Sequence, residues 1–588
     1  MSWFQQLSSV MQSRTFVLRL LLLLILAVFA ARLFYIQVIR HDYYSEQAFQ
    51  TQVSKLTILP ERGKVYALDG DKPVPLVLNQ TVYTVFADPQ EIENESAVRA
   101  AMQKIAGGEM VDGYEEFLSS DRLRYVVMAR NVSQTQAEKL REMKLAGVGF
   151  QKSSRRVYPE GQLGAQMLGY VNSEGEGQYG LEGKMDTELK GKAGLLQTVT
   201  DVRQIPLTIG RDDASISAED GQDMVLTIDR GIQQKAEEIL RTGLERAKAT
   251  KGSLLVMDPN TGRIMAMANL PTYDPAKYTE VEDYRQFQNG TVSDPYEVGS
   301  VMKVLSMGVG LDTGAVNVNS TFDNTGSVSV DGTIIKNVEE DPIYPGTSMT
   351  DVLEYSLNTG VVYVLEQMGG GNVNEKSRQT LHDYYVNRYR FGQNTGIEQA
   401  GEQPGIIIGP NEGQGRNVRY ANMAFGQGMN ITMIQTAAAF SAAMNGGTYY
   451  QPTLIQGTLD EKGEVQENAP KVVSSAVLSP PASNSLRQMT FEGRNKGFFG
   501  DKDPKGYIVG GKTGTSQIID PNTGRYTDDN SIGSYLGFGG ADKPEYVIMV
   551  RVEDSKLTTG YAGTVAAGPI FNDMSNWLIQ YLRIPPKN

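Results

Sequence analysis

Three short motifs, each present once and in a set order, constrain this chain more than any other feature. They are Ser300-Val301-Met302-Lys303, Ser356-Leu357-Asn358 and Lys512-Thr513-Gly514-Thr515. Together they supply what serine acyl transfer needs: a hydroxyl nucleophile, a base other than histidine, a proton relay and a cationic clamp for an anionic substrate. Each motif alone is common in helices, loops or strand ends, but their order, uniqueness and local setting together predict one active site.

The first motif predicts the nucleophile and its base. If the segment is helical, Lys303 lies one turn after Ser300 on the same face, so that the amine can reach the hydroxyl. Lysine acts as a base only where burial or a nearby cation lowers its pKa. Gly299 fits a tight turn into the helix, where backbone N–H groups favour developing negative charge and could hold an oxyanion. The apolar residues around the lysine, which would bury it, are Val301, Met302, Val304 and Leu305.

The other two motifs predict the groups that handle the substrate. Lys512 lies in a glycine-rich, strand-like stretch whose small residues would let a substrate backbone pair along it. With Thr513 and Thr515 this lysine could bind a carboxylate, and a backbone N–H near Thr515 could complete the oxyanion hole. Ser356 and Asn358 would approach from a third element, the serine relaying a proton and the amide orienting the substrate.

Composition excludes several other kinds of site. The 588 residues include no Cys and only two His, His41 and His382, which excludes a thiolate site and nearly excludes a His-rich metal site or a Ser-His-Asp triad. A formal net charge of −13 argues against a nucleic-acid partner. No metal or organic cofactor is predicted. The length is too great for one compact core and predicts two or three domains.

An apolar segment near the N-terminus predicts a membrane anchor. Residues Phe16 to Ile39 supply the roughly 20 apolar residues that a helix needs to cross a bilayer. Arg19 and Arg32 lie near its ends, where an arginine can reach the interface. The alternative is a cleaved signal peptide, but the apolar run continues past the candidate cleavage site, which favours an uncleaved single-pass anchor. The tail, 1–15, would then be cytoplasmic and the C-terminal bulk extracellular or periplasmic.

Beyond the anchor, the sequence predicts two folded parts. Residues 42–215 mix strands, a helix and turns, and indicate a pedestal for scaffolding or docking with two patterned patches, Arg62 to Gly70 and Arg156 to Gly161. Residues 220–588 predict an α+β domain, because strands at both ends enclose helices and their sheet would join the two ends. Pedestal strands are expected at 82–89 and 124–129, and a helix at 135–145. Strands of the second part are expected at 224–229, 252–258, 263–269, 507–515, 534–540 and 545–554, and helices at 230–249, around Ser300 and Ser356, at 432–445 and at 565–582.

These features resemble one known family, the class B, monofunctional penicillin-binding proteins, which are peptidoglycan D,D-transpeptidases. The likeness covers nearly the whole chain: besides the three motifs it includes Glu297-Val298-Gly299, the stretches 268–275 and 424–447, and both pedestal patches. It implies a serine β-lactamase-like transpeptidase domain with an antiparallel sheet flanked by helices. An elongated, dimerisation-like pedestal domain and a single transmembrane helix would precede it.

The resemblance also implies the reaction and the role of each motif residue. Members of the family act on the D-Ala-D-Ala end of a peptidoglycan stem peptide, release the terminal D-Ala and pass the acyl group to an amine on a neighbouring stem. The family is also the one that β-lactams acylate. By this likeness Ser300 is the acylated nucleophile and Lys303 its base, Ser356 and Asn358 form the second motif, and the carboxylate-binding strand contains Lys512, Thr513, Gly514 and Thr515.

Several alternatives stay open at this point. The stretch 268–275 and the compact pedestal are more similar to the division-associated branch than to the elongation-associated one. The same acyl-enzyme chemistry would serve a D,D-carboxypeptidase or a β-lactam sensor, although the anchor and pedestal favour transfer to an amine. A non-catalytic scaffold of the wall-synthesis machinery is a further alternative. No glycosyltransferase domain is predicted, and the family resemblance implies a polytopic membrane glycan polymerase as partner, with other divisome or elongation proteins.

Overall fold

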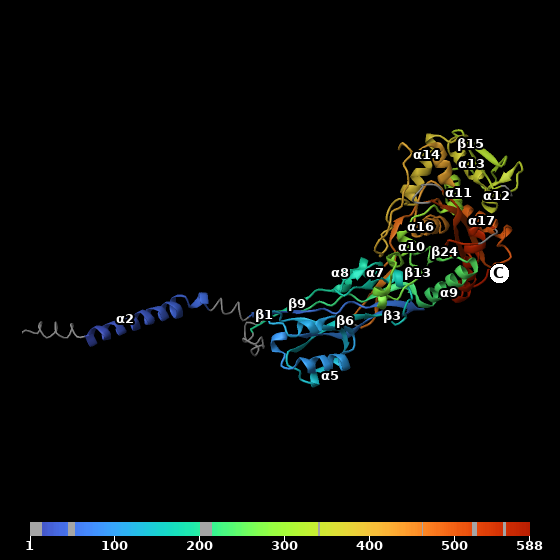
Figure 1. The fold of residues 1–588 in the computed structure, drawn as a ribbon. Coiled ribbons are helices and arrows are strands. Elements are labelled where there is room, and N and C mark those ends of the chain that lie inside the picture. The colour runs from blue at the N-terminus through green and yellow to red at the C-terminus, as the bar shows by residue number, and fades with distance from the viewer. Residues whose placement is uncertain are drawn as a thin grey trace, which may run out of the picture. The chain divides into compact units, whose positions relative to one another are not determined.

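The computed structural model describes residues 14–44, 53–199, 214–338, 341–460, 462–519, 526–556 and 560–587 (Figure 1). The chain divides into two compact units. Residues 1–61 with 191–221 form the first unit, and residues 62–190 with 222–588 form the second. Each unit therefore combines segments that are far apart in the sequence.

The first unit contains the long apolar helix. Helix α2 (Arg14–Phe34) continues into a short π-helix (Tyr35–Ile39), and together they provide the apolar span Phe16–Ile39, of which no part is buried. Its length and composition suffice to cross a membrane, which fits a single-pass anchor. An antiparallel sheet of order β1-β9-β10 completes the unit, with bounds β1 (Val53–Ile58), β9 (Gly194–Val199) and β10 (Ala214–Ile216).

In the second unit, an eight-stranded sheet runs through the predicted pedestal. The strands follow the order β20-β19-β11-β2-β3-β5-β4, and β6 pairs with β3 (Lys72–Ala87). Strand β3 pairs antiparallel with three neighbours, whereas β11 is parallel to β2. The strand expected at 224–229 is β11, and it joins this sheet instead of the one nearest the motifs. The other bounds are β2 (Val65–Asp69), β4 (Glu109–Met110), β5 (Val126–Ser133), β6 (Val148–Val157), β11 (Met224–Asp229), β19 (Ile455–Leu459) and β20 (Val465–Glu467).

Two helices cover one part of this sheet. Helix α4 (Glu95–Ala101) and helix α5 (Gln134–Glu142) enclose a small hydrophobic core with β3 and β5. Helix α5, expected at 135–145, starts at a capping box in which the Ser133 side chain accepts the backbone N–H of Gln136 and the Gln136 side chain accepts that of Ser133. This local signal explains why the start of the helix could be predicted.

A buried ion cluster joins the two patterned patches of the pedestal. Glu182, on the short helix α7 (Gly180–Lys184), is fully buried and pairs with Arg62 at 2.5 Å and with Arg156 at 2.6 Å. Arg62 also pairs with Asp186 at 2.7 Å, and Arg156 donates a hydrogen bond to Asn79 Oδ1 at 2.7 Å. Buried charges are tolerated when they are paired and hydrogen-bonded, as they are here. The arginines of the two patches therefore form part of the interior of the pedestal.

The three sequence motifs lie around a five-stranded antiparallel sheet of order β13-β12-β24-β23-β22. Two strands come from the start of the segment and three from its end, and the pairing of β12 with β24 joins the two ends as predicted. Strands β22 and β23 extend beyond their predicted bounds. The observed bounds are β12 (Lys251–Met257), β13 (Ile264–Leu270), β22 (Ile508–Ile519), β23 (Tyr526–Gly540) and β24 (Pro544–Glu553).

Helices cover both faces of this sheet. On β12, Leu254 and Val256 belong to one hydrophobic core, whereas Leu255 and Met257 belong to another, because side chains alternate along a strand. The first core includes α9 (Arg230–Ala247) and α18 (Gly568–Tyr581), and the second includes α11 (Met302–Asp312) and α16 (Met433–Met444). The helices predicted at 230–249, 432–445 and 565–582 are thus confirmed, each slightly shorter than predicted.

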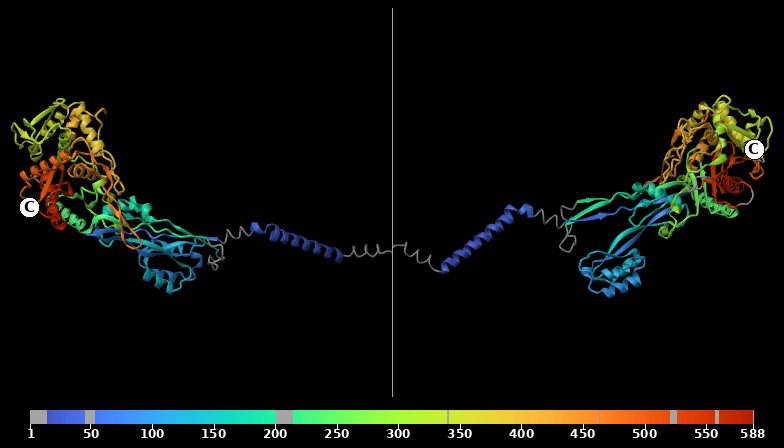
Figure 2. Two further views of the ribbon diagram at one scale, coloured as in Figure 1. Left: turned by 180° about the vertical axis from the view of Figure 1, so that it is seen from behind. Right: turned by 45° about the horizontal axis from the view of Figure 1, so that its top comes forward.

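The remaining helices complete the surroundings of the motifs. Helices α12, α13 and α14 gather at one end of the second unit, far from α5 in each view (Figures 1 and 2). Helices α15 and α17 pack against α11. The hairpin β15-β16 lies beside α13. Their bounds are α12 (Met349–Glu354), α13 (Asn358–Met368), α14 (Glu375–His382), α15 (Asn417–Ala424), α17 (Pro480–Lys496), β15 (Ser327–Val330) and β16 (Thr333–Lys336).

Candidate active site

Ser300 lies in a short 3₁₀ turn, Gly299–Val301, directly before helix α11 and against strand β22. Gly299 has a left-handed φ of 63°, and its N–H donates to the carbonyl oxygen of Gly426 at 3.1 Å. A Cβ on Gly299 would lie 2.7 Å from the carbonyl oxygen of Thr515, and one on Gly514 would lie 2.7 Å from the backbone just before the turn. Glycine allows these approaches because it has no Cβ. The first and third motifs are therefore in backbone contact.

The amine of Lys303 joins the first motif to the second. Lys303 lies in the first turn of α11 and is only 1% exposed. Its Nζ donates to the carbonyl oxygen of Ser356 and, at 3.1 Å, to the Oγ of the same serine. Ser356 occupies the turn between α12 and α13 with a left-handed φ of 61°, which is uncommon for a residue other than glycine. This conformation places the predicted relay serine beside the predicted base.

Burial and charge set the protonation of this lysine. Desolvation favours the neutral amine and the positive charge of Lys512 acts in the same direction, so the pKa of Lys303 lies well below its ordinary value. A neutral amine is what a general base requires. Asp341 opposes this effect, because its negative charge raises the pKa of Lys303. No motif or pattern in the sequence identified Asp341.

The second motif is supported by the hairpin strand β16. Asn358, the first residue of α13, donates its side-chain N–H to the carbonyl oxygen of Lys336 at 2.8 Å. The next residue, Thr359, donates its backbone N–H to the side chain of Asn337 at 3.0 Å. Two consecutive residues at the start of α13 thus bind two consecutive residues at the end of the hairpin. These two contacts fix the start of α13 relative to the hairpin.

The third motif lies on β22, the last strand of the sheet, and no described strand pairs with its outer edge. Lys512 is buried, and its Nζ donates to Thr513 Oγ1 at 3.3 Å. Burial lowers the pKa of Lys512 to about 8. Thr513 and Thr515 are half-buried, and side-chain alternation puts the two of them on one face of the strand. Thr515 Oγ1 accepts the backbone N–H of Gly563 at 3.2 Å.

Further side chains that the motifs did not predict hold the nucleophile turn in place. Glu297 is buried and accepts the backbone N–H of Gly428 at 2.7 Å. Tyr296 shares a hydrogen bond with Ser534 of β23 at 2.9 Å, and the guanidinium of Arg551 on β24 lies 4.2 Å from the centre of the Tyr296 ring. These contacts join the segment before Ser300 to the central strands, and no local pattern in the sequence indicated the partners on β23 and β24.

Comparison with known proteins identifies the family. Residues 252–576 match the Penicillin binding protein transpeptidase domain, and residues 57–226 match the Penicillin-binding Protein dimerisation domain. The chain belongs to the penicillin-binding protein family. Stage V sporulation protein D of Bacillus subtilis is 31% identical over 95% of this chain and 84% of its own length. A peptidoglycan D,D-transpeptidase FtsI homolog of Mesostigma viride is 26% identical over 94% of this chain and 93% of its own length.

Solved structures share the fold of this penicillin-binding protein. A peptidoglycan synthetase from Bifidobacterium adolescentis aligns with a TM-score of 0.71 and 23% identity, covering 91% of this chain and 98% of its own. Penicillin binding protein 3 of Mycobacterium tuberculosis, complexed with aztreonam, aligns with a TM-score of 0.67 and 23% identity over the same shares of the two chains. At this level of identity the comparison establishes the architecture.

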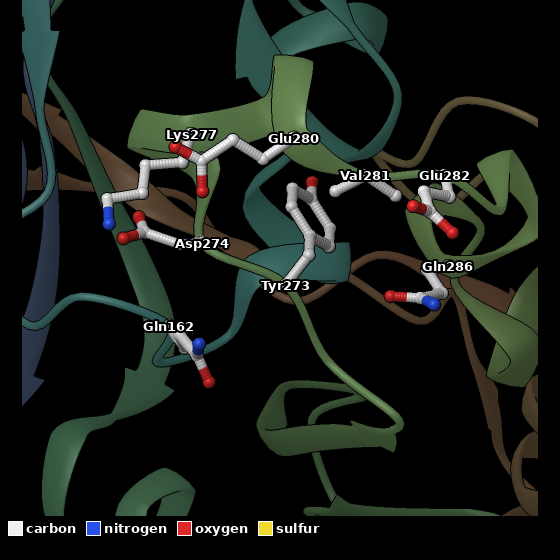
Figure 3. Close-up of a pocket in the computed structure, with 8 residues that line it drawn as sticks. All are labelled: Gln162, Tyr273, Asp274, Lys277, Glu280, Val281, Glu282 and Gln286. Carbon is white, nitrogen blue, oxygen red and sulfur yellow. The ribbon is translucent and has the colours of Figure 1, made fainter.

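A surface hollow of about 430 Å³ lies apart from the motifs of this penicillin-binding protein (Figure 3). Tyr273 lies at its centre in the close-up, and no motif residue lines it. The hollow is therefore a feature separate from the three motifs. In the part of the chain that the structure describes, no cluster of acidic or His side chains is placed to hold a metal ion. The hollow is lined by Gln162, Tyr273, Asp274, Lys277, Glu280, Val281, Glu282 and Gln286.

Proposed function

We propose that this protein is a serine-type D,D-transpeptidase that crosslinks peptidoglycan in cell division, with Ser300 as its acylated residue. The observation that carries the assignment is the hydrogen bond from the buried Lys303 amine to Ser356, beside the turn that holds Ser300. Related proteins are named for this activity, among them the FtsI homolog of Mesostigma viride and the probable transpeptidase PenA of Neisseria meningitidis. The known complex of a penicillin binding protein 3 with aztreonam supports β-lactams as inhibitors.

Acylation begins when Ser300 Oγ attacks the carbonyl carbon of the penultimate D-Ala. Lys303, neutral because it is buried, takes the hydroxyl proton as the C–O bond forms. The C–N bond to the terminal D-Ala then breaks, and the proton passes from Lys303 through Ser356 to the departing amine. Backbone N–H groups of the nucleophile turn and of β22 near Thr515 stabilise the negative oxygen of the tetrahedral intermediate.

The donor peptide is held along β22. Its backbone adds to the outer edge of the strand, which is the sheet-edge mode of peptide recognition. Lys512, Thr513 and Thr515 hold the terminal carboxylate, because a cation and hydroxyl donors suit that group. Asn358 orients the peptide from the opposite side. Below pH 8, Lys512 carries the positive charge that this role requires.

Deacylation decides between transfer and hydrolysis. An amine on a neighbouring stem attacks the ester carbon, the bond to Ser300 Oγ breaks, and a proton returns to that oxygen. The same ester could react with water in a D,D-carboxypeptidase or a β-lactam sensor. The match of residues 57–226 to the dimerisation domain supports transfer, since simple hydrolysis does not need a pedestal.

The apolar helix supports a location at the membrane. We place the tail, 1–15, in the cytoplasm, the span 16–39 in the membrane, and the pedestal (42–215) and transpeptidase domain (220–588) outside, where peptidoglycan is made. A polytopic membrane glycan polymerase is the expected partner of the anchor and pedestal. Protease added to intact cells and to lysed cells tests this arrangement: cleavage of the catalytic domain only after lysis of the cytoplasmic membrane would overturn it.

Labelling with a fluorescent penicillin tests the proposed function. Wild-type protein should form a stable covalent adduct that maps to the peptide containing Ser300, and Ser300→Ala should form none. A donor peptide ending in D-Ala-D-Ala and an amine acceptor should then give the transfer product. Folded wild-type protein that takes no label would favour the scaffold alternative, and a product formed only with water would favour the hydrolase alternative.

A further inference from the structure

The segment between helix α10 (Gly290–Ser293) and the nucleophile turn runs across the strands of the five-stranded sheet. Its first residue, Asp294, pairs with Arg551 of β24 at 3.1 Å. Two residues later, Tyr296 shares its hydroxyl hydrogen bond with Ser534 of β23 at 2.9 Å. Alternate residues of the segment therefore contact neighbouring strands, in the direction of β22 and the third motif.

The strand residues that this segment contacts form one row across the sheet. Arg551 lies opposite Ser534, and Ser534 lies opposite Gly514 of β22, so the three positions share one face of the sheet. The row ends where the segment reaches β22, because a Cβ on Gly514 would lie 2.7 Å from the carbonyl oxygen of Val298. Ser300 follows two residues later. The row thus supports the chain from α10 up to the nucleophile turn.

The guanidinium of Arg551 holds the segment at two of its residues. Its side chain is 4% exposed, its Nη1 donates to the backbone carbonyl oxygen of Asp294 at 3.1 Å, and its Nη2 pairs with the carboxylate of the same residue at 3.1 Å. The guanidinium also lies 4.2 Å from the centre of the Tyr296 ring, and Nη2 pairs with Glu553 at 3.0 Å. Arginine can make all these contacts because its donors form a fixed fork and its face packs on aromatic rings. A lysine keeps the charge but has no such fork.

The charges around Arg551 are balanced. Lys251 of β12 pairs with Asp294 at 3.0 Å and with Glu553 at 3.2 Å, which makes a cluster of two cations and two carboxylates. Burial alone would raise the pKa of Asp294, but the positive charges of Arg551 and Lys251 lower it below its ordinary value. Opposite charges this close to one another largely cancel at a distance. The cluster can therefore influence Ser300 through the position of the chain and not through a net charge.

We infer that Arg551 is a positioning residue for Ser300. It fixes Asp294 and Tyr296 on the sheet, and the chain continues from there through the contact at Gly514 into the nucleophile turn. The inference rests on the proposed acylation of Ser300 and adds to it a residue that acts through the chain before the turn. A small displacement of a reacting group costs about 10²-fold in rate. Weakening the contacts of Arg551 should therefore slow acylation, whereas the binding of a penicillin carboxylate on β22 should stay the same.

The experiment separates the binding of penicillin from its reaction with Ser300. The full-length protein, in detergent, is mixed rapidly with a fluorescent penicillin over a range of concentrations. The saturation of the rate gives the dissociation constant of the first complex and the first-order rate constant of acylation, and the final amount of label gives the fraction of correctly folded protein. Arg551→Lys keeps the charge and removes the fork, and Asp294→Asn removes one partner of that fork. Arg246→Lys changes a half-exposed arginine that pairs with Asp573 at 2.7 Å, and it serves as the matched control.

For Arg551→Lys, the rate constant of acylation should fall by about 10²-fold, while the dissociation constant of the first complex stays that of wild type. Asp294→Asn should lose about tenfold, because one charge-assisted contact is removed. The double variant should be little slower than Arg551→Lys alone, since both changes act on one contact, and Arg246→Lys should match wild type.

Two results would overturn the inference alone. In the first, Arg551→Lys takes less label but reacts at the wild-type rate constant, which is the behaviour of a residue needed only for folding. In the second, the first complex weakens while the rate constant is unchanged, which would assign Arg551 to binding. If Arg551→Lys does not fold, an unchanged rate constant in Asp294→Asn overturns the inference instead. Folded wild-type protein that takes no label would overturn the proposed function and the inference with it.

Discussion

In the proposed mechanism, two buried lysines in one site need opposite charge states. Lys303 has to be neutral to take a proton, whereas Lys512 has to be charged to hold a carboxylate. Burial lowers the pKa of both, but that of Lys512 only to about 8, so that most of it stays protonated at pH 7. The positive charge of Lys512 in turn lowers the pKa of Lys303 further. The charge that the proposed mechanism assigns to Lys512 therefore also favours the neutral form of Lys303.

Replacing Lys303 by Arg tests the base directly. Arginine keeps a positive charge but stays protonated, so it cannot accept the proton of Ser300. The rate of Ser300 acylation by a fluorescent penicillin should fall by about 10²–10⁴-fold, the contribution of a general base. Lys336→Arg, which changes an exposed lysine of β16, serves as the matched control and should react normally. Acylation of Lys303→Arg at a near-normal rate would exclude this lysine as the base.

The titration of Lys512 predicts how acylation depends on pH. Below about pH 8 the amine is charged and captures the substrate carboxylate, and above that pH it becomes neutral and the capture weakens. The second-order rate constant for penicillin acylation should therefore decline on the alkaline side, with a midpoint near 8. In Lys512→Arg the charge persists, so this decline should disappear. The same alkaline decline in both proteins would assign the midpoint to another group.

At the scale of elements, contact between the first and third motifs depends on glycine. Gly514→Ala would add a Cβ 2.7 Å from the backbone before the nucleophile turn and would push that turn away from β22. A displacement of this kind near reacting atoms costs about 10²-fold in rate, so penicillin acylation should fall by about that factor. Gly413→Ala, where nothing lies within 4 Å of the added carbon, is the control and should have no effect. Similar acylation rates for the two variants would show that the close contact is not needed.

Local patterns predicted most elements but not how they meet. Strand composition located β12, β13 and β24, and an amphipathic pattern located α9, because burial of alternate or helically spaced residues leaves a trace in the sequence. Gly299 indicated a tight turn before Ser300, but neither the packing of that turn against β22 nor the left-handed conformation of Ser356 left such a trace. Both depend on partners remote in the sequence, and so does the effect of Asp341 on the lysines. Motif chemistry could nominate the residues of the candidate site, whereas their contacts needed the tertiary structure.

At the scale of the whole molecule, the contacts inside the pedestal could not be predicted from local sequence patterns either. The patches at Arg62 and Arg156 were expected to be turns with a scaffolding or docking role, and nothing in the sequence pointed to their shared partner. Glu182 lies far from Arg62 in the chain, yet it accepts ion pairs from both arginines in the interior. Patterned arginines can thus belong to the interior when carboxylates elsewhere in the sequence pair with them.

The buried cluster predicts that the pedestal depends on Glu182 for stability and that Ser300 chemistry does not. Glu182→Gln would leave two buried guanidiniums without their shared carboxylate, which costs about 3–5 kcal/mol in the free energy of unfolding. Glu238→Gln, which removes a partly exposed pair with Lys235 at 2.9 Å, should cost less than about 1 kcal/mol. Urea unfolding followed by far-ultraviolet circular dichroism gives the two free energies, and penicillin labelling without urea reports the active site. Equal stability of the two variants would mean that solvent or other groups replace the carboxylate, and a labelling defect in folded Glu182→Gln would show that the pedestal influences the nucleophile.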